Sequence, residues 1–242
     1  MKRLAVTLAL VLAAFALHAQ KPALDHSVYD SWKTLRGLSV PQNGDILTYM
    51  VSPGEGDLVL VIEDLKNNKK IEIPRATRAT INQDGTKAVA VIKPLFSQTR
   101  DAKIKKVKKD EMPKDTLAII DIMSGEVKKY ANYKSHNTPD KLTSTIAFEL
   151  TPAKEKPAPK GKPEANGEKP AEKKDAKKDG KKAPVKELYV MDINTFAIDT
   201  LKNVASYRFN KEGDILAYTV EPEKKDTVTT PALMLYTVAA KQ

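Results

Sequence analysis

The feature that most constrains this chain is a short repeated motif, a Gly-containing turn followed by an apolar strand. Its copies are Asn43-Gly44-Asp45 before 46–51, Asp84-Gly85-Thr86 before 87–92, Glu212-Gly213-Asp214 before 215–220, and a weaker Pro139-Asp140-Lys141 before 142–150. Glycine beside Asn or Asp supplies the positive φ angle that a tight hairpin turn needs. The residues that follow are mostly β-branched, aromatic or aliphatic, which favours strands over helices.

A second motif alternates with the first: a strand, an aspartate, a turn and another strand. Its copies occupy 58–65 with 70–73, 117–122 with 127–130, 187–193 with 197–201, and a last strand at 233–238. One copy of each motif makes a four-stranded unit. The undisturbed spacing, from Gly44 to Gly85, is 41 residues, as expected for a propeller blade. The sequence therefore predicts an all-β fold, a partial β-propeller of about four four-stranded blades.

Two insertions interrupt these repeats. Residues 152–186 hold twelve Lys, four Glu and two Asp, with Val185 the one clearly hydrophobic side chain beyond Ala. Such a segment buries too little apolar surface to offset its ordering entropy, so we expect a disordered Lys/Pro-rich loop. It carries much of the formal net charge of +10. We favour a solvated spacer over a segment that binds nucleic acid or another anionic surface. No aromatic residue lies among the lysines to stack on the bases of a single strand.

The other insertion runs from about Phe96 to Asp115 and lacks Gly. It is compatible with a short helix or an extended excursion, and Ile104 and Val107 are spaced to pin one face to the blade. Its six Lys and Arg100 could form a phosphate-binding face. A solvated surface is the favoured interpretation, since charge runs usually have no partner.

The N-terminal residues have the pattern of a cleavable signal peptide. Lys2 and Arg3 precede an apolar run from 4 to 17, and small-residue cleavage chemistry follows before Gln20 or Lys21. The run is shorter than the roughly 20 residues of a membrane span, and no Cys is present for lipidation or disulfides. A buried N-terminal helix is the alternative. We expect a periplasmic or secreted protein without a membrane span.

The expected organisation has four parts. Residues 1–20 form the signal peptide, and 21–151 form blades 1 and 2 and the start of blade 3. Residues 152–186 form the disordered loop, and 187–242 form the rest of blade 3 and blade 4.

Residues with catalytic potential are scarce. Beyond the signal peptide only His26 and His136 remain, and His136 is expected in an exposed polar loop. No H-E-x-x-H, phosphate-binding Gly loop or G-x-S-x-G elbow occurs. Asp25-His26-Ser27 has the composition of a triad, but neighbours in an extended segment point to opposite faces. We therefore predict no catalytic, cofactor-binding or metal-binding residue, and no cofactor.

Other distinctive residues have structural interpretations. Residues 82–85 resemble a calcium loop, but a hairpin turn is favoured because no suitably placed acid follows. Trp32 is expected to pack between the N-terminal segment and blade 1. Tyr49 and Tyr218 occupy the same place in two repeats and are expected to serve blade packing.

Several segments carry a resemblance to a known family. They are 24–33, 71–75, 92–96, 99–106 and 112–117, together with the Lys/Pro-rich insert. They resemble the blade domain of secreted prolyl oligopeptidase family serine peptidases of the Bacteroidetes type. That resemblance implies a propeller that caps an α/β-hydrolase domain and filters the peptides reaching its Ser, Asp and His. No position here matches the family's catalytic motif, so no catalytic residue is carried over.

The leading hypothesis is a non-catalytic N-terminal propeller fragment of such a peptidase, truncated before the hydrolase domain. Either such a fragment has lost its role, or a separate chain supplies the missing blades and the catalytic domain. In both cases peptide substrates would be met only through the parent enzyme. The alternative is a stand-alone periplasmic binding or scaffold module. An adhesive basic protein and an independent hydrolase are less favoured.

Overall fold

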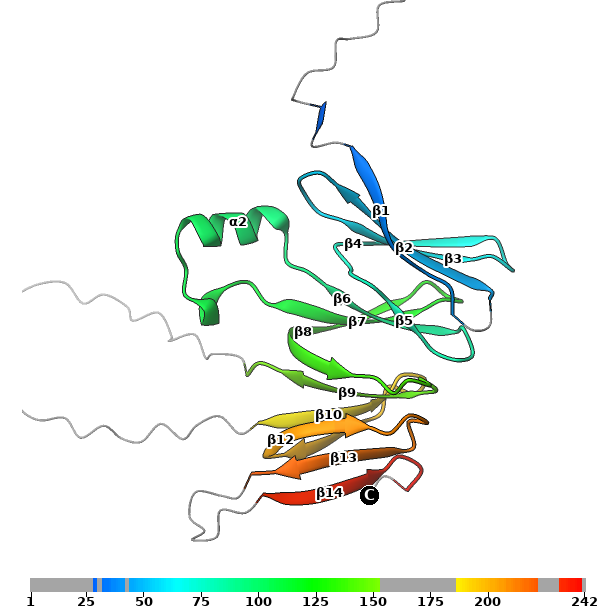
Figure 1. Cartoon of the computed structure of the whole chain (residues 1–242), viewed down its shortest axis with the longest axis vertical. Coiled ribbons are helices and arrows are strands. Elements are labelled where there is room, and N and C mark those ends of the chain that lie inside the picture. The colour runs from blue at the N-terminus through cyan, green and yellow to red at the C-terminus, as the bar shows by residue number, and fades with distance from the viewer. Residues whose placement is uncertain (1–27, 30–31, 42–43, 153–185, 222–230, 241–242) are drawn as a thin grey trace, which may run out of the picture.

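The computed structural model describes residues 28–29, 32–41, 44–152, 186–221 and 231–240. The expected signal peptide, the Asp25-His26-Ser27 segment and nearly all of the Lys/Pro-rich insert lie outside these residues. The described chain is almost entirely β, with one α-helix, which confirms the predicted all-β class. Its strands form a stack of antiparallel sheets (Figure 1).

The first sheet is one complete four-stranded unit, which we call blade 1. Each strand pairs with the next along the chain, in the order β1-β2-β3-β4. The strands are β1 (Lys33–Ser39), β2 (Ile46–Pro53), β3 (Val59–Asp64) and β4 (Lys69–Pro74). The two hairpin motifs predicted from the sequence therefore pair as expected.

Blades 2 and 3 are joined into one seven-stranded sheet. Its strands are β5 (Thr80–Ile81), β6 (Lys87–Ile92), β7 (Asp115–Asp121), β8 (Val127–Asn137), β9 (Thr145–Leu150), β10 (Glu187–Asp192) and β11 (Ile198–Lys202). The first half of β8 pairs with β7 as the fourth strand of blade 2. Its second half pairs with β9 as the first strand of blade 3.

This shared strand corrects the expectation of separate four-stranded units. Residues 127–137 contain neither Gly nor Pro to end the strand. The direction changes at Asn132 instead, which adopts a left-handed φ of 60° that Asn tolerates better than most residues. The Asn132 carbonyl accepts a hydrogen bond from the Thr151 amide at 2.7 Å, which ties the bend to the end of β9.

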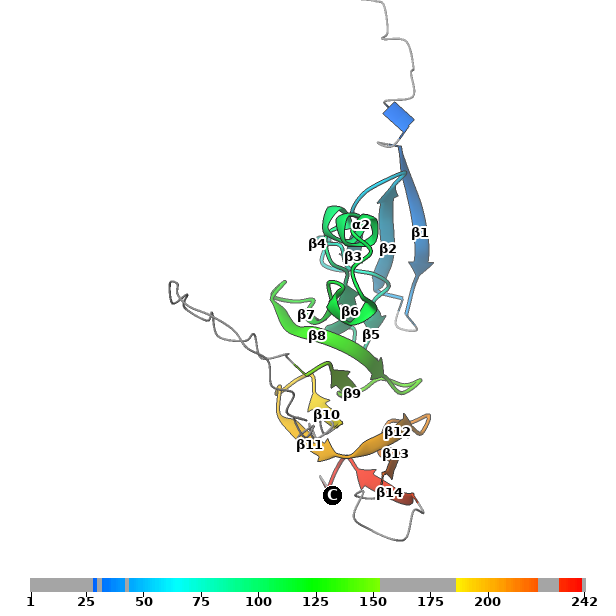
Figure 2. The ribbon, with the colours of Figure 1, turned by 90° about the vertical axis from the view of Figure 1, so that its left-hand side faces the viewer.

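Blade 4 has three described strands, β12 (Val204–Phe209), β13 (Ile215–Val220) and β14 (Ala232–Thr237). It lies at the far end of the stack from blade 1 (Figures 1 and 2). The repeat strands predicted at 87–92 and 215–220 match β6 and β13 in both bounds. The weaker copy predicted at 142–150 begins later, at Thr145, because Leu142 lies buried in the preceding turn.

The hydrophobic core consists of three layers, one between each pair of successive blades. In the two middle blades, the second strand alternates between two layers. In β6, Ala88 and Ala90 pack against blade 1, whereas Val89 and Val91 pack against blade 3. Such alternation follows from the two-residue period of a strand. Every blade is thus apolar on both faces wherever it has a neighbour on both sides.

One long connection projects from the side of the stack (Figure 1). The connection between β6 and β7 contains α2 (Phe96–Ile104) and a 3₁₀ turn, η2 (Lys109–Glu111), which confirms the predicted helical insert. Its anchoring differs from the prediction, since Ile104 is exposed and Ala102 is the buried helix residue. Blade 1 holds the helix through polar contacts: the Phe96 amide donates to the Asp57 carboxylate at 2.8 Å, and Arg100 pairs with Glu55.

The aspartates of the second motif stabilise the turns that follow them. Asp64, Asp121 and Asp192 each accept hydrogen bonds from backbone amides two or three residues later. Asp121 also pairs with Lys87 of the neighbouring strand at 2.5 Å. The hydrogen bond from Lys87, together with that from the Ser124 amide, lowers the pKa of Asp121 to about 2.

Replacing Asp121 with Asn should lower the free energy of unfolding at pH 7 by about 1–2 kcal/mol. A depressed folded-state pKa adds stability above the unfolded value near 4, and this contribution is lost as pH falls toward 2. Chemical unfolding at pH 7 and pH 2.5 measures the effect. The difference between the variant and the parent should be largest at pH 7 and clearly smaller at pH 2.5, whereas Asp110→Asn, at an exposed site, should change little. A difference that is equal at both pH values would contradict this account.

Gly213 lies where a turn of blade 4 packs against a turn of blade 3, so a substitution there tests this packing. Its φ is +83°, and an added Cβ would lie 2.8 Å from Cγ of Pro139 in blade 3. Gly125 has a φ of +82° and open space around it, so it is a matched control. Gly125→Ala should cost about 1 kcal/mol from backbone strain. Gly213→Ala should cost roughly 1–3 kcal/mol more because of the added clash. Unfolding midpoints of the two variants give the comparison, and equal losses would argue against close packing of blades 3 and 4 here.

Candidate functional site

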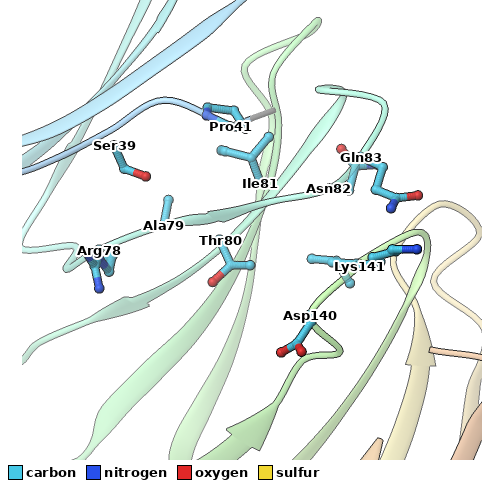
Figure 3. A pocket seen from close by; sticks show the side chains of 11 residues that line it. Ser39, Pro41, Arg78, Ala79, Thr80, Ile81, Asn82, Gln83, Asp140 and Lys141 are labelled. Carbon is cyan, nitrogen blue, oxygen red and sulfur yellow. The ribbon is translucent and has the colours of Figure 1, made fainter. Parts of the chain in front are cut away.

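The main candidate site is an open pocket of about 430 Å³ to which three successive blades contribute. Blade 1 supplies Ser39 and Pro41 at the end of β1, and blade 2 supplies residues 78–83 around β5. Blade 3 supplies residues 140–142 from the turn between β8 and β9. Figure 3 shows Ser39 and Pro41 on one edge, Asp140 and Lys141 on the other, and β5 between them. We call this the hub pocket, because the first strands of the blades converge on it.

Hydrogen bonds between blades fix the lower edge of the hub pocket. The Gln83 amide of blade 2 donates to the Leu142 carbonyl of blade 3 at 2.7 Å. The Lys141 amide donates in turn to the Lys211 carbonyl of blade 4 at 3.1 Å. The Lys141 ammonium also binds the Glu212 carboxylate at 2.7 Å. The pocket therefore has a backbone framework that extends from blade 2 to blade 4.

The charges in the pocket suit a polar ligand. Arg78 and Asp140 are exposed, and neither has an ion pair or hydrogen bond within the described residues. Ser39 and Thr80 add hydroxyls, while Ala79, Ile81 and Leu142 add apolar lining. One free guanidinium and one free carboxylate can bind the two charged ends of a short peptide or similar zwitterion. The sequence motifs did not identify Arg78, because it lies between two copies of them. Its position just before β5, the first strand of blade 2, was the one signal that could have indicated a place in this pocket.

His136 does not lie in an exposed polar loop, which corrects the prediction. It lies in β8, half-buried, and its Nδ1 is 2.7 Å from the Tyr133 hydroxyl. Burial lowers its pKa, which favours a neutral imidazole. The neighbouring Ser135 hydroxyl is instead 3.1 Å from Tyr207, whose pKa burial raises to about 12. Ser135 and His136 therefore have different partners and do not form a nucleophile–base pair.

The remaining predicted residues have structural roles where the structure describes them. Trp32 is 56% exposed, and its ring lies 4.9 Å from that of Tyr29 in the N-terminal segment. Tyr218 packs in the layer between blades 3 and 4, as predicted. Tyr49 is half-buried and donates to Glu63 at 2.7 Å, which raises its pKa. Among the described residues, no group of three or more His, Cys, Asp or Glu is arranged to hold a metal ion.

Asn82 confirms the hairpin interpretation of residues 82–85. Its side chain is 1% exposed, and its Oδ1 accepts from the amides of Thr86 and Lys87 at 2.9 Å each. Its Nδ2 donates to Thr86 and reaches the Thr143 carbonyl of blade 3 at 3.4 Å. The Asn82 side-chain oxygen, which a calcium loop would offer to the ion, is therefore already hydrogen-bonded to backbone amides of the turn.

The stacked antiparallel sheets place this protein in the class built from β-propeller blades. Its sequence and structure were compared with known proteins. No family model matches the sequence, and no curated protein matches it. Among solved structures, it is similar to the β-propeller domain of the Trilobed protease from Pyrococcus furiosus, with 15% identity and a TM-score of 0.43. It is also similar to Pyrococcus horikoshii acylaminoacyl peptidase, with 13% identity and a TM-score of 0.44. A structure from a study of two prolyl endopeptidases has 11% identity and a TM-score of 0.48.

These similarities extend over much of this chain but only part of the other proteins. The chain is covered to 84%, 89% and 88%, against 54%, 32% and 29% of the three structures. At such identities and TM-scores they do not establish a family. Separately, no helix in the described part of the chain is long and apolar enough to cross a membrane.

Replacing Asn82 with Ala should lower the free energy of unfolding by about 2 kcal/mol, because two backbone amides lose their acceptor in a buried turn. Thermal melts of the parent and the variant measure the loss. Millimolar calcium or EDTA should leave the parent's melting temperature unchanged. A calcium-dependent rise that Asn82→Ala abolishes would restore the calcium-loop interpretation.

Proposed function

We propose that this chain is a non-catalytic propeller module of a prolyl oligopeptidase-type serine peptidase and helps select the peptides that reach a catalytic domain outside residues 1–242. The observation that carries the proposal is the convergence of three blades on the hub pocket. A pocket of about 430 Å³ has room for peptide side chains but not for a folded protein. The family resemblance of segments such as 99–106 and 112–117 gives independent support from the sequence.

The residues of the hub pocket suit this role chemically. Arg78 offers a planar, always-charged donor for a peptide carboxylate, and Asp140 offers an acceptor for an ammonium group. Neither has to break an existing ion pair within the described residues to bind. The hydroxyls and small apolar side chains between them match a peptide backbone without demanding one sequence. Selection by size and terminal charge follows from such a site.

Export is part of the same proposal. The basic residues Lys2 and Arg3 before the apolar run 4–17 support a cleaved signal peptide and a periplasmic or secreted location. A peptidase module in that compartment would meet short peptides from degraded proteins.

A stand-alone binding module is the second candidate. It is favoured by the fact that Arg78 and Asp140 form a binding site without any group from another domain. A neighbouring reading frame with a G-x-S-x-G nucleophile elbow, whose product co-purifies with this chain, would favour the peptidase module. A chain that binds peptides with no such neighbour would favour the stand-alone role.

Peptide binding tests the hub pocket directly. The purified chain should bind a proline-containing hexapeptide with free termini, and Arg78→Ala should weaken that binding roughly tenfold through loss of a charge-assisted hydrogen bond. Isothermal titration calorimetry measures both affinities. Arg36→Ala, an exposed arginine of β1 that does not line the pocket, is the matched control and should bind like the parent. Equal weakening by both variants, or no binding by the parent, would reject the pocket.

The isolated chain should not hydrolyse the same peptide, and a serine-directed phosphonate should not label it. Chromatography of the incubated peptide and mass spectrometry of the protein check these outcomes. Hydrolysis that disappears when one of the chain's own serines is replaced would overturn the non-catalytic role.

A further inference from the structure

A second pocket, of about 370 Å³, lies where blade 1 meets the connection that contains α2. It is lined by the turn between β2 and β3, by Arg75 after β4, and by residues of the connection from β6 to β7. We call it the helix pocket, because Phe96 and Thr99 of α2 line it. It lies at the opposite end of β6 from the hub pocket and shares none of its residues.

Arg75 has an unusual backbone conformation in this pocket. Its φ is +65°, in the left-handed region that strains every residue with a Cβ. Blade 1 and blade 2 hold it there: its amide donates to the Leu58 carbonyl at 2.6 Å, and its carbonyl accepts from the Lys93 amide at 2.9 Å. The next residue, Ala76, already pairs with Ile92 of β6. Strained residues that their surroundings hold in place cluster at ligand-binding sites.

The Arg75 guanidinium is oriented but largely unused. The residue is partly buried, and its Nη1 donates to the Lys93 carbonyl at 3.0 Å. Arg75 makes no ion pair within the part of the chain that the structure describes. A guanidinium has five N–H donors, so most of them remain for another partner. A carboxylate is the partner that this planar group binds best, through two parallel hydrogen bonds.

The other charged groups of the helix pocket already have partners. The Lys93 ammonium pairs with the Asp115 carboxylate at 2.6 Å. The Asp57 carboxylate accepts from the Phe96 amide at 2.8 Å, at the N-terminus of α2, where the helix dipole compensates a negative charge. Arg75 is therefore the charged group of this pocket that still lacks a compensating partner among the described residues.

The rest of the lining is largely apolar. Leu58, Pro94, Phe96 and Pro113 line the pocket, and Phe96 is 38% exposed. Apolar walls with one convergent charged group are typical of pockets for small molecules. A volume of about 370 Å³ lies near the lower end of their range, which suits a ligand the size of one amino acid.

We propose that the helix pocket binds a small carboxylate that carries an apolar group, about the size of one aromatic or aliphatic amino acid. The carboxylate binds the Arg75 guanidinium, and the apolar group packs on Phe96 and Pro113. This site goes beyond the proposed function, because the selection of peptides at the hub pocket involves none of its residues.

Isothermal titration calorimetry with N-acetylphenylalanine tests the site. The parent should bind it, and Arg75→Gly should weaken binding at least about tenfold. The melting temperature of Arg75→Gly should not fall, because Gly adopts a positive φ without strain, so loss of binding cannot come from misfolding. Arg36→Ala, which removes an exposed arginine of β1 outside the pocket, is the matched control and should bind like the parent.

The ligand has its own control. N-acetylphenylalanine amide, which lacks the carboxylate, should bind the parent no better than the acid binds Arg75→Gly. A parent that does not bind the acid at about 10 mM, or equal binding by parent and Arg75→Gly, would overturn the proposal. Binding that Arg78→Ala abolishes and Arg75→Gly retains would place the ligand in the hub pocket and overturn it as well.

Chemical modification gives a test that needs no variant. Phenylglyoxal modifies arginines, and mass spectrometry of peptide fragments measures the rate at each one. N-acetylphenylalanine should slow the modification of Arg75 and leave that of Arg36 unchanged. Equal rates at Arg75 with and without the ligand would contradict the site. This readout does not depend on peptide binding at the hub pocket, so it separates failure of the helix pocket from failure of the proposed peptidase role.

Discussion

The structure depends on one interaction, the packing of the two apolar faces of each sheet against neighbouring blades. With no disulfides available in a chain that has no Cys, burial between blades must supply most of the stability. A strand such as β6 can satisfy two neighbours at once because alternate side chains point to opposite faces. This explains why the buried residues fall into three layers and not into one central core. It also explains why the end blades differ from the middle ones.

The same stacking creates the hub pocket. The first strands and first turns of successive blades are brought together by backbone hydrogen bonds from Gln83 to Leu142 and from Lys141 to Lys211. The long connection that contains α2 lies on the other side of the stack (Figure 1). An open pocket with a guanidinium and a carboxylate that have no ion-pair partner among the described residues suits recognition of a small polar ligand. Catalysis by acyl transfer would need a nucleophile within reach of a base, and Ser135 and His136 have separate partners.

Much of the fold could be read from the sequence because its turns are encoded locally. The Gly-containing turns and the aspartates at 64, 121 and 192 act within a few residues of themselves, so their strands were predicted closely. The bend at Asn132 was missed because one left-handed residue within an unbroken strand has no turn signature. The exposure of Ile104 and the half-burial of His136 were also missed. Both depend on which neighbouring strand or helix face covers the side chain, which spacing along the chain does not specify.

The sequence by itself determined the class of fold, the number of repeats and the place of the helical insert, since strand alternation and turn chemistry are properties of short segments. Tertiary structure alone decided that Arg78, Asp140 and Ser39 share one pocket, because they belong to three blades and meet through stacking. It also decided that Leu233 and Leu235 are exposed while Leu188 and Val190, at the same positions of blade 3, are buried. Identical local patterns acquire different surroundings according to whether another sheet packs on them, and that is a property of the assembled stack.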